Sequence, residues 1–317
     1  MPSVDEPVLV EVVRSGLVES RHRGSVVGLN GDGSVAFARG DVERLVYSRS
    51  ANKPVQATAM VELGLDLPPE LLALVCASHN GEPMHIDGVR QILAGAGLDE
   101  TALRNAPGLP LHEHSADDVI RAGGGPASLL QNCSGKHAGM LATCVVNGWS
   151  VEGYLELDHP LQAHITGVVQ LVTGEPVAHI GVDGCGAPAH AVSLTGLARA
   201  FATVATASDG SAMHQVRRAM IARPDMVGGT GREVTALMAG VPGLMAKDGA
   251  EGVLAGGLPD GRAVALKLAD GSWRGFAAAM LAALDHLDVD TSGATALRSI
   301  PVLGGGQPVG EARAVAF

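Results

Sequence analysis

The sequence predicts a mixed α/β (α+β) protein, in which an antiparallel sheet with flanking helices is interrupted by an all-helical insertion. Short β-branched runs lie near both ends of the chain, and the middle carries apolar residues at helical spacing. Glycine-rich turns such as Asn30-Gly31-Asp32-Gly33 separate the runs, as they do in hairpins. We therefore expect one continuous two-lobed unit, with residues 1–49 and 241–317 in a sheet lobe and residues 50–240 in a mainly helical lobe.

The expected elements follow from the spacing of apolar residues and from glycine, proline and other turn residues between them. Strands are expected at residues 8–14, 25–29, 34–39, 244–247, 252–258, 262–268 and 309–317, with an apolar lead-in at 42–47. Helices are expected from Pro54 onward and at residues 68–75, 86–93, 133–147, 160–174, 211–222 and 276–287. Because the strands return after residue 240, the C-terminal strands can rejoin the first sheet.

Composition limits the classes of function. Hydrophobic residues make up 46% of the 317 residues and charged residues 17%, which predicts a well-buried core. The net charge of -11 argues against nucleic-acid binding. The N-terminus has no basic start followed by an apolar run, and no stretch approaches the roughly 20 apolar residues that span a bilayer, so a cytoplasmic protein without a membrane role is expected.

Cysteine usage indicates free or metal-bound thiols. The four cysteines are too scattered for a disulfide framework in a chain of this length; they are Cys76, Cys133, Cys144 and Cys185.

Ser50-Ala51-Asn52-Lys53-Pro54 is the first candidate for chemistry. Residues i and i+3 share one face of a helical turn, which brings a lysine amine near a serine hydroxyl. A lysine acts as a base only where burial or a second cation lowers the pKa of its amine. Pro54 places the helix start at or just after Ser50. A plain helix N-cap serine is the alternative interpretation.

Three glycine-containing junctions carry further polar groups. Residues 76–83 include Ser78, a candidate second hydroxyl, beside His79 and Asn80, although a Ser/Asn turn explains such a segment equally well. Residues 132–137 place Cys133 at a helix start next to Lys136, which favours a thiolate that binds metal or acts as a nucleophile.

Residues 181–186 form the third junction, where glycines leave Asp183 and Cys185 accessible. Asp183 is a candidate to orient or balance a cation. Cys133 and Cys185 are candidates for a two-thiolate zinc site, with buried free thiols as the alternative, since their spacing matches no common zinc finger.

Two lysines of the C-terminal strands are alternative candidates for a cleft lysine. Lys267 interrupts a strand that is otherwise apolar on both sides, so it is expected to point into a cleft unless it is an ordinary surface lysine. Lys247, before Asp248-Gly249, is the rival for the same role.

Strands, a Ser-x-x-Lys helix, a helical insertion and returning strands together resemble the arrangement of serine β-lactamases and penicillin-binding proteins. Four motifs in one order over nearly the whole chain resemble the Rhizobium-type L-asparaginases, the asparaginase II family. They are Ser-Arg-Ser-x-x-Lys-Pro, Ala-Ser-His-Asn-Gly-Glu-Pro, Asn-Cys-Ser-Gly-Lys-His and Asp-Gly-Cys-Gly-x-Pro.

This resemblance implies hydrolysis of the side-chain amide of L-asparagine by a homodimeric, zinc-containing enzyme. It implies two serine-lysine pairs, Ser50 with Lys53 and Ser78 with Lys267, and zinc ligands at Cys133, Lys136 and Cys185. Substrate-binding residues are expected among Arg49, His79, Asn80 and Asp183, where the guanidinium of Arg49 suits the α-carboxylate.

Two other functions compete with this interpretation. A penicillin-recognising hydrolase or esterase shares Ser-x-x-Lys but has no use for the Cys133 and Cys185 pair. A non-catalytic amino-acid-binding module has no use for intact serine-lysine pairs. Ammonia release from asparagine separates all three.

Overall fold

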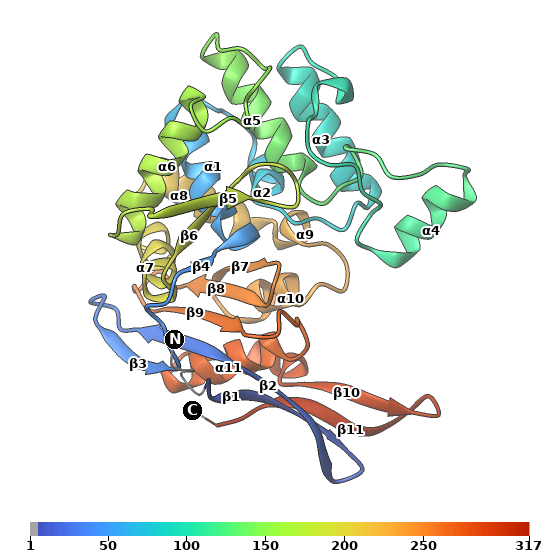
Figure 1. Cartoon of the computed structure of the whole chain (residues 1–317), viewed down its shortest axis with the longest axis vertical. Helices are drawn as coiled ribbons and strands as arrows, with labels where there is room; N and C mark the ends of the chain where they lie inside the picture. Colours follow the sequence, from blue (N-terminus) through green and yellow to red (C-terminus); the bar gives the residue numbers. More distant parts are fainter. Residues whose placement is uncertain (1–5, 317) are drawn as a thin grey trace.

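An eight-stranded antiparallel sheet forms the lower half of the computed structural model, which describes residues 6–316 (Figure 1). Its main path runs β10 (Ser299–Gly304), β11 (Gln307–Ala314), β1 (Val8–Arg14), β2 (Leu17–Leu29), β9 (Ala263–Leu268), β8 (Val253–Gly257) and β7 (Met245–Gly249), and β3 (Val35–Arg39) also pairs with β2. β1 pairs with β11 and β2 with β9, so the C-terminal strands do rejoin the first sheet. The predicted α/β fold class is confirmed.

Helices occupy most of the middle of the chain. They are α1 (Lys53–Glu62), α2 (Pro69–Val75), α3 (Pro83–Gly95), α4 (Glu113–Arg121), α5 (Ser134–Val146), α6 (Pro160–Thr173), α7 (Leu194–Ala205), α8 (Ala212–Ala222), α9 (Pro224–Val227) and α10 (Glu233–Gly240). The described part of the chain also forms three short 3₁₀ helices, which are η1 (Arg49–Asn52), η2 (Glu100–Ala102) and η3 (Ser292–Leu297). Within residues 6–316, no helix is both long enough and apolar enough to cross a membrane.

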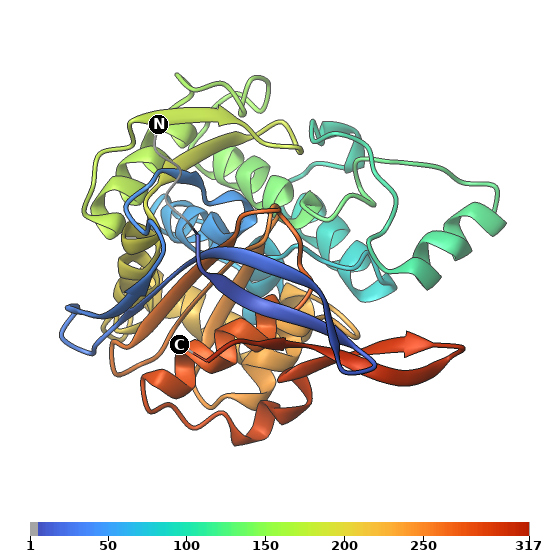
Figure 2. The same cartoon turned by 60° about the horizontal axis from the view of Figure 1, so that its bottom comes forward.

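The large sheet is covered from two sides. α7 packs against β2, β8 and β9, and α11 (Phe276–His286) packs against β1, β9 and β11 (Figures 1 and 2). Gly257 of β8 lies so close to α7 that an added Cβ would sit 2.5 Å from the Phe201 carbonyl oxygen. Small residues therefore let a helix backbone approach the sheet directly, as the low aromatic content suggests.

A small second sheet lies within the middle region and departs from the expected all-helical insertion. β4 (Val46–Tyr47) pairs with β6 (Pro188–Val192), which pairs with β5 (His179–Val182). The β5 and β6 strands are only 4 and 5 residues long and contain Gly181 and Pro188, which obscure a strand pattern. The loop between them carries Asp183 and Cys185, so the third polar junction is the tip of a hairpin.

Three parts of the chain meet at the free edge of the large sheet. β7 is the last strand in the order and contacts η1, the turn that leads into α1. Residues 77–81, which follow α2, are held by backbone hydrogen bonds from Ser78 to Val227 and from His79 to Asn132. Residues 1–5 and 317, at the ends of the expected sheet lobe, lie outside the described residues, and the division into two lobes stays a prediction.

Candidate active site

The Ser78 hydroxyl lies between two lysine amines. Lys53 Nζ is 3.1 Å and Lys247 Nζ 3.0 Å from Ser78 Oγ. The side chains come from the first residue of α1, the loop after α2 and the edge strand β7, and all three residues are buried. A serine hydroxyl donates one proton and an ammonium accepts none, so Ser78 donates to an amine only when that lysine is neutral. The arrangement is a proton path between two amines.

Burial lowers the pKa of Lys247 to about 8, with Lys53 and Arg232 acting in the same direction and Asp248 opposing them. Lys247 Nζ also donates to the Asp248 backbone oxygen at 2.7 Å and to its carboxylate. The neutral amine therefore becomes the main form above about pH 8 and is already present in part at neutral pH, which suits a general base.

Ser50 lies in η1 and is partly exposed, unlike Ser78. Its hydroxyl forms no hydrogen bond within residues 6–316. Lys53 instead donates to the Ala77 carbonyl, Ser78 Oγ and Cys133 Sγ, which uses all three protons of its ammonium form. The predicted direct pairing of Ser50 with Lys53 is thus absent, because the lysine side chain extends toward the buried loop. Ser50 is the partly exposed serine, and Ser78 is the buried serine that is hydrogen-bonded to lysines.

The turn that carries Ser50 is strained and tightly packed. Arg49 has φ +49°, a left-handed conformation that costs a non-glycine residue free energy and is concentrated at functional sites. An added Cβ at Gly249 of β7 would lie 2.9 Å from the Ser48 carbonyl oxygen and 3.2 Å from the Ala51 nitrogen. β7 therefore supports the Ser50 turn through a position that has no room for a side chain.

Gly249→Ala is expected to displace this turn. We expect kcat to fall about tenfold or more through misplacement of Ser50, with a loss of about 1–3 kcal/mol in unfolding free energy from overpacking. Steady-state kinetics and denaturant unfolding measure both. The control is Gly167→Ala in α6, where no atom lies within 4 Å of the added Cβ, so activity is expected to stay unchanged. The higher helix propensity of alanine is expected to increase the unfolding free energy by at most about 1 kcal/mol. If Gly249→Ala had the same kcat and KM as Gly167→Ala, Gly249 would have no role in supporting the Ser50 turn.

Lys267 does not meet Ser78, and the pairing implied for it is wrong in this structure. Its amine donates to the backbone carbonyls of Glu251, at 2.5 Å, and Leu268, at 2.7 Å. Lys247 occupies the predicted place. The signal that identifies it is Lys247-Asp248-Gly249, a lysine followed at i+2 by glycine, as in the Lys-Thr-Gly strand motif of penicillin-recognising enzymes.

His79 and Asn80 are buried, and their side chains are hydrogen-bonded to other groups of the protein. His79 Nε2 lies 2.9 Å from Ser134 Oγ, and its Nδ1 accepts from the Gly81 amide at 3.1 Å. Asn80 donates to the Thr230 carbonyl at 2.8 Å. Burial lowers the pKa of His79 well below its ordinary value, which keeps the ring neutral. These contacts hold the loop that carries Ser78, and a role of His79 and Asn80 in substrate binding stays a prediction.

Cys133 and Cys185 meet in a small buried cluster with Ala187, separate from the main core. Lys136 Nζ lies 3.2 Å from Cys185 Sγ, so the three predicted metal ligands come together. All four cysteines are free in the structure. No group of three His, Cys, Asp or Glu side chains suited to a metal occurs in residues 6–316, so this set of two thiols and one amine is an unusual candidate.

The charges of this cluster are linked. A hydrogen bond from Cys185 holds the pKa of Cys133 well below its ordinary value; burial opposes this shift, and Lys53 and Lys136 assist it. Burial alone would lower the pKa of Lys136, but Cys185, Cys133 and Asp183 outweigh it and raise that pKa. The cluster thus favours a thiolate beside an ammonium group. A cation of higher charge that displaces the ammonium proton fits the same donor atoms.

Arg49 and Asp183 form a partly exposed ion pair next to the cysteine cluster. Arg49 Nε donates to Asp183 Oδ1 at 2.9 Å, with side-chain exposures of 22% and 13%. Burial would raise the pKa of Asp183, but Lys136 and Arg49 bring it below its ordinary value. Opposite charges that remain partly accessible suit the two charged groups of an amino-acid substrate.

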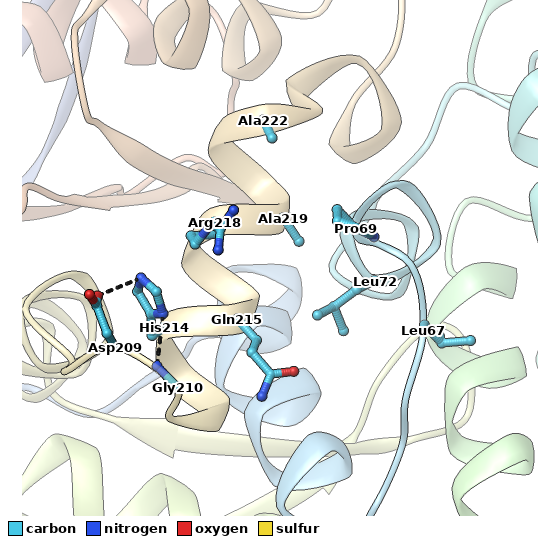
Figure 3. Close-up of a pocket in the computed structure, with 10 residues that line it drawn as sticks. All are labelled: Leu67, Pro69, Leu72, Asp209, Gly210, His214, Gln215, Arg218, Ala219 and Ala222. Atoms are coloured by element: carbon cyan, nitrogen blue, oxygen red, sulfur yellow. Dashed lines mark hydrogen bonds and ion pairs between the residues drawn. The ribbon is translucent and has the colours of Figure 1, made fainter.

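A cavity of about 380 Å³ lies elsewhere, beside α2 and α8 (Figure 3). His214 is 3.0 Å from the Asp209 carboxylate and accepts from the Gly210 amide at its rim. Gln215 and Arg218 project from the same helix. None of the predicted site residues lines this cavity, so it is distinct from the Ser78 site.

Comparison with known proteins identifies the class. A model of the L-asparaginase II family matches residues 10–314. No curated protein matches the chain. The match defines an amidohydrolase. The chain belongs to the L-asparaginase II family.

Solved structures that resemble the chain include three bacterial proteins. A β-lactamase from Mycobacterium bovis is 15% identical, with 86% of this chain and 93% of that chain covered and a TM-score of 0.36. A putative β-lactamase from Bacteroides dorei is 16% identical, with 77% and 84% covered and a TM-score of 0.42. A Bacillus subtilis glutaminase, in covalent complex with 5-oxo-L-norleucine, is 14% identical, with 78% and 80% covered and a TM-score of 0.36. Likenesses this low support no conclusion about chemistry.

Proposed function

We propose that the protein hydrolyses the side-chain amide of L-asparagine to L-aspartate and ammonia through an acyl-enzyme on Ser50. The observation that carries this proposal is the hydrogen-bonded path Lys53–Ser78–Lys247 beside the turn that presents Ser50. Family membership supports an amide as the substrate.

The proposed acylation begins with attack of Ser50 Oγ on the carboxamide carbon. For this step Lys53 is in its neutral form, which has only two protons to donate, so its amine releases one of its three acceptors and turns its lone pair toward Ser50. The hydroxyl proton then passes to Lys53 and is shared through Ser78 with Lys247. The C–N bond then breaks, and the nitrogen leaves as ammonia with a proton returned along the same path. Water attacks the acyl-enzyme, loses its proton to the path, and releases L-aspartate with Ser50 restored.

Arg49 and Asp183 supply substrate recognition in this proposal. The Arg49 guanidinium binds the α-carboxylate, and the Asp183 carboxylate binds the α-ammonium group. Arg49 and Asp183 form an ion pair with each other in the structure. When the substrate binds, two new ion pairs replace this one, so neither side chain is left with an uncompensated charge.

The test is a coupled ammonia assay on L-asparagine and L-glutamine, with benzylpenicillin and a p-nitrophenyl ester as rival substrates. Ammonia from asparagine, at a kcat/KM above that for the rivals, supports the proposal. Turnover of only penicillin or ester would identify a penicillin-recognising hydrolase. Tight asparagine binding by calorimetry without ammonia would identify a binding module.

We also propose that Cys133, Lys136 and Cys185 hold one zinc ion, which they fit by donor type and mutual contact. Bound there, zinc would supply a fixed positive charge that helps orient a substrate. The residues themselves hold Lys53 through Cys133 Sγ and keep Asp183 beside Lys136.

Elemental analysis is expected to find about one zinc per chain in protein purified without chelator. Cys133→Ser and Cys185→Ser should each lose that metal, whereas Cys144→Ser, in the core of α5, should keep it. Full reaction of Cys133 and Cys185 with a thiol reagent before any chelation would contradict the site. Absence of both metal and free thiols would indicate a Cys133–Cys185 disulfide instead.

The expected homodimer and cytoplasmic location stay predictions. Light scattering of the purified protein tests the first of them.

A further inference from the structure

Arg232 joins the two segments that carry Ser78 and Lys247. It lies directly before α10, and its guanidinium donates to the Ser78 carbonyl at 3.0 Å and to the Asp248 carboxylate at 2.5 Å. A longer contact of 3.5 Å reaches Asn80 Oδ1. Its side chain is only 17% exposed. One side chain therefore connects the loop after α2 with the free edge of the sheet.

The sheet edge needs such a connection. β7 has a hydrogen-bonded strand on one side only, and the Lys247 amine ends a flexible four-carbon chain. Asp248 Oδ1 accepts from Lys247, whereas Arg232 donates to Oδ2. The Arg232 guanidinium fixes Oδ2 of Asp248, so the Asp248 carboxylate can hold the Lys247 amine from one direction. Ser78 Oγ accepts a hydrogen bond from the same amine from another direction.

Trp273 fixes the guanidinium on its other side. The Arg232 guanidinium carbon lies 5.8 Å from the centre of the Trp273 ring, a cation–π distance, and the indole nitrogen donates to the Gly249 carbonyl at 3.1 Å. The ring thereby holds Arg232 against β7. A cavity of about 280 Å³ is lined by Arg232, Asp248 and Trp273, and also by Arg274, an exposed residue.

We propose that Arg232 is a positioning residue that holds the Lys247 amine against Ser78 through Asp248. This inference rests on the proposed function only for its kinetic effect. The placement of the amine and its titration are properties of the protein alone.

The electrostatic effect of Arg232 has a definite sign. The groups around the Lys247 amine are Asp248 from β7, Lys53 from α1, Cys76 at the end of α2 and Arg232 before α10. Burial raises the pKa of Cys76 to about 12, so it stays uncharged at neutral pH. Removal of Arg232 deletes a cation that lowers the pKa of Lys247 and frees Asp248 to favour the ammonium form. Both changes raise that pKa.

Glu233 is a further titratable group near Asp248. Burial, with Asp248 assisting, raises the pKa of its carboxyl to about 7. Since it acts on Lys247 only through Asp248, Glu233→Gln is expected to shift the Lys247 titration less than a change at Arg232 does.

The first test is direct titration of Lys247. The chain has four lysines, Lys53, Lys136, Lys247 and Lys267, so protein labelled with ¹³C and ¹⁵N in lysine gives few side-chain signals to assign. Compared with the wild type, Arg232→Gln is expected to raise the Lys247 midpoint by at least half a pH unit. Asp248→Asn removes the group that opposes proton loss and is expected to lower it. Arg274→Gln, a change in the same cavity at an exposed residue, should leave it unchanged.

Kinetics supply the second test. Arg232→Gln is expected to lower kcat about 10- to 100-fold with KM changed less than threefold, and to move the alkaline rate limb upward. Arg232→Lys keeps the charge but loses the two-pronged guanidinium, so it restores the Lys247 midpoint more than it restores kcat.

Unmoved midpoints in both Arg232→Gln and Asp248→Asn would overturn the proposal, as would a change in KM alone. Circular dichroism checks that each variant folds. Should Arg232→Gln fail to fold, Arg232→Lys takes its place: a lower kcat with a Lys247 midpoint near that of the wild type supports the proposal, and a wild-type kcat overturns it. Protein that titrates as expected but releases no ammonia from asparagine would refute the proposed function and leave the role of Arg232 intact.

Discussion

Ser50→Ala is expected to abolish ammonia release from L-asparagine, with kcat reduced at least about 10³-fold. Ser50 Oγ is the partly exposed hydroxyl of the site, and an alanine there removes the atom that forms the acyl bond. The hydroxyl makes no hydrogen bond within residues 6–316, so its loss should cost little stability. We expect the Tm to stay within about 2 °C of the wild type.

Ser78→Ala is the matched comparison. It breaks the path between Lys53 and Lys247 but leaves the proposed nucleophile in place, so slow turnover with an intact acyl-enzyme is expected. Near-normal turnover in Ser50→Ala, together with complete loss in Ser78→Ala, would transfer the nucleophile to Ser78.

Lys247→Met is the second change with a large expected effect. General acid–base groups contribute about 10²–10⁴-fold, and this amine is one end of the proton path. In the wild type the pKa of Lys247 is lowered to about 8, so the neutral, proton-accepting form grows as the pH rises through that value. Activity should therefore climb between about pH 7 and 9, and the variant should lose this limb along with most of its rate. A pH–rate profile of kcat/KM measures both.

Lys267→Met separates the two lysine assignments. Its amine is bound to two backbone carbonyls and does not reach Ser78, so nearly unchanged kinetics and an unmoved limb are expected. A profile that is flat from about pH 6 to 10 in the wild type, or an active Lys247→Met protein beside an inactive Lys267→Met protein, would contradict the assignment of Lys247.

Local sequence signals predicted much of the fold. The Asn30-Gly31-Asp32-Gly33 turn does join β2 to β3, and Asp248-Gly249 and Pro259-Asp260-Gly261 lie at the ends of the C-terminal strands. β10 was missed because it contains Pro301. Proline is tolerated there because β10 lies at the opposite end of the strand order from β7. An edge strand has a neighbour on one side only, so a residue without a backbone N–H need not break a hydrogen bond of the sheet.

The choice between Lys247 and Lys267 could not be made from strand patterns. In the observed register Lys247 of β7 pairs with Ala255 of β8, and Ala255 pairs with Ala265 of β9. Paired residues share a face of the sheet, and so do residues two apart on one strand, so Lys267 lies on the same face as Lys247. They differ in strand position, since β9 lies two strands, or about 10 Å, from β7. Strand order depends on long-range pairing, and no short motif encodes it.

The contacts of Lys53 were unpredictable for a similar reason. Spacing of i and i+3 correctly places Ser50 and Lys53 near one another along the chain, and the Lys53 amide does bond to the Ser50 carbonyl. The direction of the lysine side chain is set by acceptors from residues 77, 78 and 133, which are remote in sequence. Motifs thus predicted which residues gather, while the fold determines which of them touch.

Covalent trapping tests the central claim most directly. The protein is incubated with 5-diazo-4-oxo-L-norvaline, an asparagine analogue with a diazomethyl ketone in place of the carboxamide, and is then digested with a protease that cleaves after glutamate. Cleavage after Glu62 or Glu70 separates Ser50 from Ser78, and fragmentation of the labelled peptide by tandem mass spectrometry distinguishes Ser50 from Ser48. We predict one adduct per chain on the peptide that contains Ser50, and none in Ser50→Ala; an adduct on Ser78 that persists in Ser50→Ala would contradict the proposal.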